Sequence, residues 1–205
     1  MTGSDLMAQL NVSRETLARL QIFADLLVKW NPHINLVSRN SLADVWGRHI
    51  ADSVHVFRVA SAAEHWVDLG SGGGFPGMVA AILAMDEAPD TRTTLIESDQ
   101  RKATFLRTVV RETGAQCVVI SDRIEAVPRQ QADVLSARAL ADLSDLLYHA
   151  ERHLALGGVA LFPKGVTWQK EVDAAQRRWQ FEVEAIKSLT KPGAAILKIT
   201  GVSRV

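Results

Sequence analysis

The sequence predicts an α/β protein in which a mostly parallel, seven-stranded sheet carries a C-terminal antiparallel hairpin and an N-terminal helical cap. Residues 13–60 place apolar side chains at helical spacing, whereas short apolar runs begin at residue 65. Helical stretches separate most of these runs, which is the pattern of βαβ units and of a parallel sheet covered on both faces. A tight turn joins the last two runs, so those two strands must be antiparallel.

The helical cap is expected to occupy residues 1–63, and residues 64–205 are expected to form one compact unit. Ser13 is a good N-cap for a first helix, which carries a stripe of apolar residues. Asn31-Pro32 is predicted to end that helix, because the residue before a proline is pushed out of the α region. A second helical stretch is expected over residues 41–60, where Gly47 is placed to interrupt it.

The later segments give the strands and helices of the sheet unit. Lys191-Pro192-Gly193 supplies the tight turn between the last two strands. The expected helices cover residues 76–86, 99–113, 141–154 and 167–178. The expected strands cover residues 65–69, 93–96, 117–120, 133–135, 159–162, 181–189 and 195–202.

Composition narrows the class of protein. The chain has 205 residues, 47% of them hydrophobic, which suits one domain with a buried core. Lys plus Arg number 23 and Asp plus Glu number 23, so contact with nucleic acid would need a local basic patch. The single cysteine, Cys117, excludes an intramolecular disulfide framework and a cysteine-based zinc cluster. Residues 1–10 lack the features of a secretory signal and no apolar run could span a membrane, so we expect a soluble, cytoplasmic protein.

A glycine-rich loop follows the first expected strand. Four glycines stand at positions 70, 72, 73 and 74, and a helix is expected to begin near Pro76. Four glycines in five positions exceed the need of a tight turn, and glycine lets the backbone approach a ligand closely. Ligands of open parallel sheets bind at the carboxyl ends of the strands. The loop therefore predicts a ligand site at this edge of the sheet.

Two ligands fit the loop. From Gly72 the letters match G-x-G-x-x-G, which keeps a dinucleotide open. From Asp68 they match Asp-x-Gly-x-Gly-x-Gly, the loop of S-adenosylmethionine methyltransferases, and a carboxylate there could face the cofactor's ammonium group or a bound water. Glu97 ends the next strand and can accept hydrogen bonds from ribose hydroxyls. A carboxylate beside the loop would repel a pyrophosphate, which favours S-adenosylmethionine over an NAD-type oxidoreductase.

These residues resemble the RsmG (GidB) family, bacterial enzymes that methylate guanine N7 in 16S ribosomal RNA. The resemblance covers nearly the whole chain, and its one small departure within the motifs is Gly73, where alanine or proline is common. It implies a Rossmann-like S-adenosylmethionine methyltransferase fold, with S-adenosylmethionine as cofactor and 16S rRNA as partner, in the 30S subunit or an assembly intermediate. The motifs that carry it are Lys29-Trp30-Asn31, Arg48-His49-Ile50 with Asp52-Ser53, Gly74-Phe75-Pro76-Gly77, residues 95–106, Arg123-Ile124-Glu125, residues 136–141 and Lys164-Gly165.

The resemblance also implies a set of site residues. Ile124 and Glu125 would hold the adenine, and Arg138 would face cofactor and substrate as a positioning residue. No residue is assigned as a general base, because guanine N7 already exposes a lone pair. No metal is expected, and a monomer is expected. The residues expected at the cofactor are Gly70, Gly72, Phe75, Glu97, Ser98, Ile124, Glu125 and Arg138.

Contact with RNA is expected at Arg101, Lys102, Arg123 and Lys164. Arg101 and Lys102 open the helix beside the glycine loop, and at 100° per residue Arg101 shares an exposed face with Arg107 and Arg111. The target base is expected to flip out of its stack.

Several other features have simpler interpretations. His149 and His153 lack a third zinc ligand and are expected on a surface helix. Arg48, His49 and Asp52 are expected to form a hydrogen-bonded cluster that fixes the cap. An NAD-type oxidoreductase and a non-catalytic ribosome assembly factor remain the alternative functions.

Overall fold

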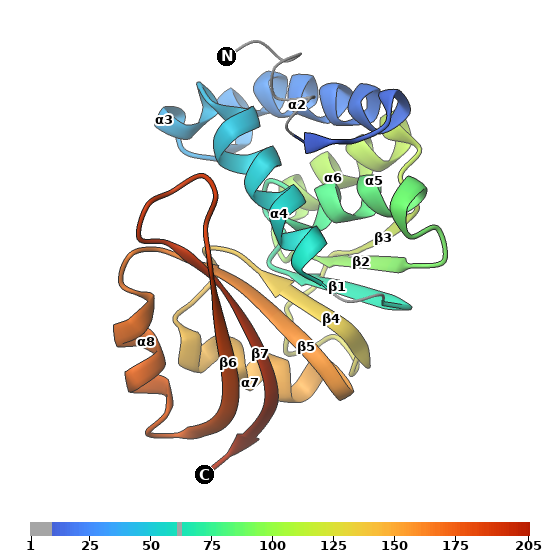
Figure 1. Cartoon of the computed structure of the whole chain (residues 1–205). Coiled ribbons are helices and arrows are strands. Elements are labelled where there is room, and N and C mark those ends of the chain that lie inside the picture. Colours follow the sequence, from blue (N-terminus) through green and yellow to red (C-terminus); the bar gives the residue numbers. More distant parts are fainter. Residues whose placement is uncertain (1–9, 61–62) are drawn as a thin grey trace.

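The computed structural model describes residues 10–60 and 63–205, and its centre is one seven-stranded sheet (Figure 1). The strand order is β3-β2-β1-β4-β5-β7-β6. The first five strands pair in parallel, whereas β7 lies antiparallel between β5 and β6. The strands are β1 (His65–Leu69), β2 (Arg92–Ile96), β3 (Cys117–Ile120), β4 (Ala132–Ala137), β5 (Leu154–Lys164), β6 (Trp179–Lys187) and β7 (Ala195–Arg204).

Helices cover both faces of the sheet, which confirms the predicted α/β architecture. Buried side chains of α4, α5 and α6 pack on one face, and α7 and α8 pack on the other (Figure 1). Residues 1–9, where the absence of a secretory signal was expected, and residues 61–62, at the expected unit boundary, lie outside the described residues. The helices are α2 (Arg14–Ile34), α3 (Arg39–Leu42), the π-helix η1 (Trp46–Ile50), α4 (Ala51–Val59), α5 (Gly77–Glu87), α6 (Gln100–Thr113), α7 (Leu143–His153) and α8 (Trp168–Ala175).

The first long helix begins where the sequence predicts but ends later. The Ser13 hydroxyl accepts a hydrogen bond from the backbone N–H of Thr16 at 3.0 Å, which confirms the N-cap. The predicted end at Asn31-Pro32 is wrong, because α2 continues through Pro32 to Ile34. Proline removes one backbone donor in the last turn, and Asn35 then closes the helix in the left-handed conformation, with its N–H bonded to the Asn31 carbonyl at 3.0 Å.

The second helical stretch of the cap is divided into three pieces. The expected interruption at Gly47 takes the form of the π-helix η1, in which the backbone N–H of Ala51 donates to the carbonyl of Trp46, five residues earlier. The Gly47 N–H itself donates to Asp44 Oδ1 at 3.1 Å. This wider turn lies directly before α4 and, as described below, reaches the functional site.

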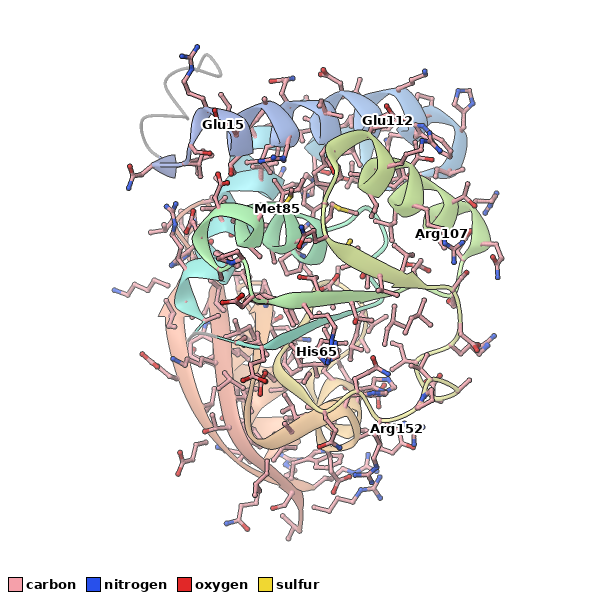
Figure 2. The ribbon with its side chains drawn as sticks, turned by 90° about the vertical axis from the view of Figure 1, so that its right-hand side faces the viewer. Glu15, His65, Met85, Arg107, Glu112 and Arg152 are labelled. Atoms are coloured by element: carbon pink, nitrogen blue, oxygen red, sulfur yellow. The ribbon has the colours of Figure 1, made fainter. Side chains whose placement is uncertain are left out.

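The cap packs as a further layer above α5 and α6 (Figures 1 and 2). Phe23 of α2 is fully buried and its ring lies 5.0 Å from that of Phe75 and 6.3 Å from that of Phe105, measured between centroids. The Trp30 ring lies 5.8 Å from Phe105. The described part of the cap and the sheet unit therefore share one hydrophobic core. None of the described helices is long and apolar enough to cross a membrane.

Candidate active site

A cleft of about 1690 Å³ opens at the carboxyl ends of the parallel strands. Its walls come from the glycine loop after β1, the segments after β2, β3 and β4, the end of β5 and the cap. Ligands of open α/β sheets bind at this edge. All eight residues expected at the cofactor line this cleft: Gly70, Gly72, Phe75, Glu97, Ser98, Ile124, Glu125 and Arg138.

Backbone conformation explains the glycines of the loop. Gly70 and Gly72 have φ values of +59° and +51°, a region that residues with a side chain rarely adopt. Gly77 is required for a different reason, since a Cβ there would lie 2.4 Å from Cβ of Asp68 and 2.5 Å from a methyl of Leu95. The loop therefore lies directly on the ends of β1 and β2 and presents backbone, with few side chains, to the cleft.

Glu97 is the buried carboxylate of the cleft. Its side chain follows β2 and is 7% exposed. Oε2 accepts the backbone N–H of Gly72 and Oε1 accepts that of Asp99, each at 2.7 Å. Each carboxylate oxygen keeps a further lone pair, so Glu97 can also accept hydrogen bonds from two hydroxyls of a sugar.

Asp68 lies elsewhere than the glycine motif predicts. It is fully buried beneath the loop and does not line the cleft, so it cannot face a ligand's ammonium group from there. Its Oδ1 accepts the Ser136 hydroxyl at 2.6 Å, and that hydroxyl accepts the indole N–H of Trp66 at 2.9 Å. Burial raises the pKa of Asp68 to about 6, although the hydrogen bonds from Ser136 and Ser71 and the charge of Arg138 oppose the shift. Asp68 thus joins β1 to β4 below the site.

Arg138 connects the cleft to the cap. Its Nη2 donates to Nδ1 of His49 at 2.8 Å, and its Nη1 lies 3.9 Å from Oδ2 of Asp52. The guanidinium carbon lies over the Phe75 ring, 5.0 Å from its centroid, and the His49 ring stacks on the same Phe75 at 4.8 Å. The cluster expected from His49 and Asp52 is therefore present and includes Arg138, whereas Arg48 is exposed at the cleft wall.

Two residues of this network were missed by the sequence analysis. Ser188 and Thr190 lie in the turn between β6 and β7 and donate their hydroxyls to Oδ1 of Asp52 at 3.3 and 3.0 Å. Lys191 of the same turn lines the cleft. The sequence signal in this region, Lys191-Pro192-Gly193, predicts a turn between two strands but does not show that the turn contacts the cap.

The residues expected to contact RNA divide into two groups. Lys102 and Arg123 line the cleft, and the side chain of Arg101 is 71% exposed, with its guanidinium 3.2 Å from Asp99. Lys164 instead donates from Nζ to the Ala141 carbonyl at 2.8 Å and to Oε2 of Glu171 at 2.7 Å. Its charge is balanced inside the wall of the cleft, which argues against a free phosphate ligand at this position.

The exposed face predicted for α6 is present. Arg107 projects from the outer side of the helix (Figure 2) and donates to the Val119 carbonyl at 3.2 Å, and Arg111 pairs with Glu112 at 2.9 Å. Both arginines lie outside the cleft.

As expected, α7 is a surface helix, with Tyr148 and Glu151 on its exposed face, but both histidines are buried. His149 is 8% exposed and His153 is fully buried, and burial lowers the pKa of His153 to about 4. His153 packs against the rest of the protein, whereas His149 lines the cleft. The described residues hold no group of three or more side chains arranged to bind a metal ion.

Comparisons with known proteins show which family the chain belongs to. The model of the GidB family, rRNA small subunit methyltransferase G, matches residues 16–198. Ribosomal RNA small subunit methyltransferase G of Ruegeria pomeroyi is 61% identical over 196 residues, which cover 96% of each chain.

Solved structures with low sequence identity share the fold. A ribosomal protein L11 methylase from Lactobacillus delbrueckii subsp. bulgaricus has a TM-score of 0.59 at 16% identity, covering 75% of this chain and 78% of that one. TYW2 from M. jannaschii, in complex with AdoMet, has a TM-score of 0.53 at 15% identity, covering 77% of this chain and 76% of that one. The fold is therefore the Rossmann-like methyltransferase fold, and the chain belongs to the rRNA small subunit methyltransferase G family.

Proposed function

We propose that this protein transfers a methyl group from S-adenosylmethionine to N7 of a guanine in 16S rRNA. The observation that carries the proposal is the cleft of a family member in which the glycine loop, Glu97 and Arg138 meet at the carboxyl ends of the strands. When bound, S-adenosylmethionine supplies a methyl group activated by a sulfonium centre.

The cleft fits this cofactor better than a dinucleotide. Glu97 has lone pairs left to accept ribose hydroxyls, and the backbone of Gly70 and Gly72 allows close approach. Ile124 and Glu125, which also line the cleft, are the proposed adenine contacts. The reversed direction of β7 disfavours an NAD-type oxidoreductase, whose nucleotide-binding sheet is mostly parallel.

The reaction needs alignment more than proton transfer. Guanine N7 carries a free lone pair, so no proton has to be removed before methyl transfer. Asp68, the carboxyl group with the raised pKa, is sealed from the cleft and is not placed to act as a base. Arg138 is the proposed positioning residue, because a guanidinium can donate to guanine O6 while the base is held in near-attack geometry.

RNA is proposed to approach across the mouth of the cleft. Lys102 and Arg123 line it and Arg101 is exposed nearby, so their charges can meet phosphates around the target base. A base must leave its stack to enter, which costs least for an unpaired loop base. We further propose that the protein acts as a cytoplasmic monomer without a metal, on the 30S subunit or an assembly intermediate, with residues 1–63 as the cap.

Transfer of tritium from labelled S-adenosylmethionine tests the proposal. Naked 16S rRNA, 30S subunits and an assembly intermediate are offered in parallel, and N7-specific cleavage with primer extension locates the methylated guanine. Gly70→Val is the inactive control. At φ +59° its Cβ would lie 2.5 Å from Cδ1 of Leu140, and the valine side chain is expected to block the cleft. Cofactor binding by calorimetry without incorporation into any RNA would support the non-catalytic assembly factor instead.

A further inference from the structure

The π-helix of the cap brings an imidazole to the one arginine that faces the cleft from the end of β4. We propose that His49 is a positioning residue for Arg138: its bare Nδ1 accepts a hydrogen bond that orients the guanidinium toward the target guanine. This inference rests on the proposed function, because it assigns a residue to the alignment of that substrate.

The hydrogen bond between the two side chains fixes the state of the imidazole. A guanidinium only donates, so Nδ1 of His49, at 2.8 Å from Nη2 of Arg138, must accept, and the ring proton of neutral His49 lies on Nε2. Burial, with the charges of Arg138 and Arg48, lowers the pKa of His49 to about 4. The carboxylate of Asp52 lies 3.9 Å from Nη1 of Arg138. His49 is therefore neutral and able to accept at neutral pH.

Arg138 is held on several sides and still reaches the cleft. Nη2 is bonded to His49, Nη1 is near Asp52, and the guanidinium carbon is 5.0 Å from the Phe75 centroid. The Arg138 side chain is 19% exposed and lines the cleft. Since a guanidinium has five N–H donors, donors remain for O6 of a base. Without the acceptor at His49, the Arg138 side chain would still contact the Phe75 ring, but the orientation of its guanidinium would no longer be fixed.

The local fold explains why the cap can supply this acceptor. His49 lies in the π-helix and Asp52 three residues later, in the first turn of α4, and both contact Arg138. The Ser53 hydroxyl donates to the carbonyl of His49 at 2.6 Å, and the turn between β6 and β7 holds Asp52 from the other side. π-Helical turns often occur at functional sites.

Two substitutions at His49 distinguish the role of its hydrogen-bond acceptor from the role of its aromatic ring. His49→Phe keeps an aromatic ring to stack on Phe75 but has no acceptor, whereas His49→Asn offers an amide oxygen near the place of Nδ1 and loses the ring. We expect His49→Phe to reduce kcat on 30S subunits by about 100-fold, the size of effect that misplacing a substrate can have. His49→Asn should retain kcat within about tenfold of the wild-type value, since a charge-assisted hydrogen bond to Arg138 is kept.

Binding of S-adenosylhomocysteine shows whether a variant has lost only the alignment of Arg138 or has lost the cofactor site as a whole. In both variants its Kd should change by a much smaller factor than kcat does in His49→Phe, because Glu97 and the glycine loop keep their contacts. Thermal unfolding monitors the fold, and His33→Asn, at an exposed histidine of α2, should match wild type throughout. Equal loss of kcat in both His49 variants, or a parallel loss of cofactor affinity, would overturn the positioning role.

Nitrogen NMR of the imidazole gives a readout that needs no RNA. The protein should show the Nε2–H tautomer at His49, and Arg138→Met should raise the pKa of His49, because the cation that opposes protonation is removed. An Nδ1–H tautomer, or an unchanged pKa, overturns the inference even if the wild-type protein methylates 30S subunits. A wild-type protein that methylates no RNA overturns the proposed function, and with it the role given to His49.

Discussion

Replacing Asp68 by asparagine should change the pH dependence of stability. The pKa of Asp68 is 3.8 in an unperturbed chain and about 6 in the folded protein, where burial opposes ionisation. The unfolded chain therefore releases this proton first as pH rises, and the folded state loses relative stability until the pH passes the folded pKa. The full loss is about 3 kcal/mol, at about 1.4 kcal/mol per pH unit. Asparagine does not titrate, so the variant escapes this loss.

Urea unfolding of wild type and Asp68→Asn at two pH values measures the effect. The free energy of unfolding of the variant, relative to wild type, should rise by about 2 kcal/mol between about pH 4.5 and about pH 7.5, since part of the loss has already occurred at the lower pH. A constant cost of the amide, for example at the Ser136 hydroxyl, cancels in this difference. Asp90→Asn, at an exposed carboxylate, should give a flat difference. A flat difference for Asp68→Asn would show that Asp68 ionises normally in the folded protein and would refute the argument from burial.

Three further predictions, made with five substitutions, test the site. Gly77→Ala should lower the free energy of unfolding by about 1–3 kcal/mol or prevent folding, because the new Cβ would lie 2.4 Å from Cβ of Asp68. The control Gly165→Ala has open space around the new Cβ and should not lower stability. Equal stability of the two variants would contradict the packing of the loop. Glu97→Gln should weaken S-adenosylhomocysteine binding by about 10- to 100-fold in calorimetry, since an amide N–H replaces an acceptor of a charge-assisted bond, and an unchanged Kd would exclude Glu97 from the ribose site. Lys164→Met should lower stability by about 1–3 kcal/mol, because Glu171 loses its cationic partner. It should leave the salt dependence of RNA binding unchanged, whereas Arg123→Glu should make that dependence shallower. The opposite pattern would restore a phosphate contact at Lys164.

Local signals explain why the fold and the lining of the cleft could be predicted. The change from helical spacing to short apolar runs marks β1, and strand alternation does not depend on distant contacts. The glycine loop and Glu97 follow consecutive parallel strands, so topology alone places them at one edge of the sheet. The corresponding cleft residues therefore came together as expected.

The errors concern side chains whose partners are distant in sequence or hidden by backbone geometry. Pro32 removes a single donor, and the end of the helix is set further on, by the left-handed Asn35 and by the Asn31 side chain, which accepts the Val37 N–H; local propensity does not show this. Asp68 points to the face covered by α5, where Gly77 leaves room for it. Lys164 finds Glu171 only because α8 folds back toward the end of β5. The π-helix has no pattern of its own that a spacing analysis could detect.

The position of β7 has a consequence for synthesis of the chain. β6 is made before β7 but pairs with β7 alone among the described strands, so it cannot join the sheet until the later strand has been inserted beside β5. Translation therefore produces β7 after both of the strands, β5 and β6, that it joins. A frameshift or stop codon just before Ala195 would leave β6 without a pairing partner and would make β5 an unpaired edge strand. Although most of its residues had been made, this truncated product would be prone to aggregate.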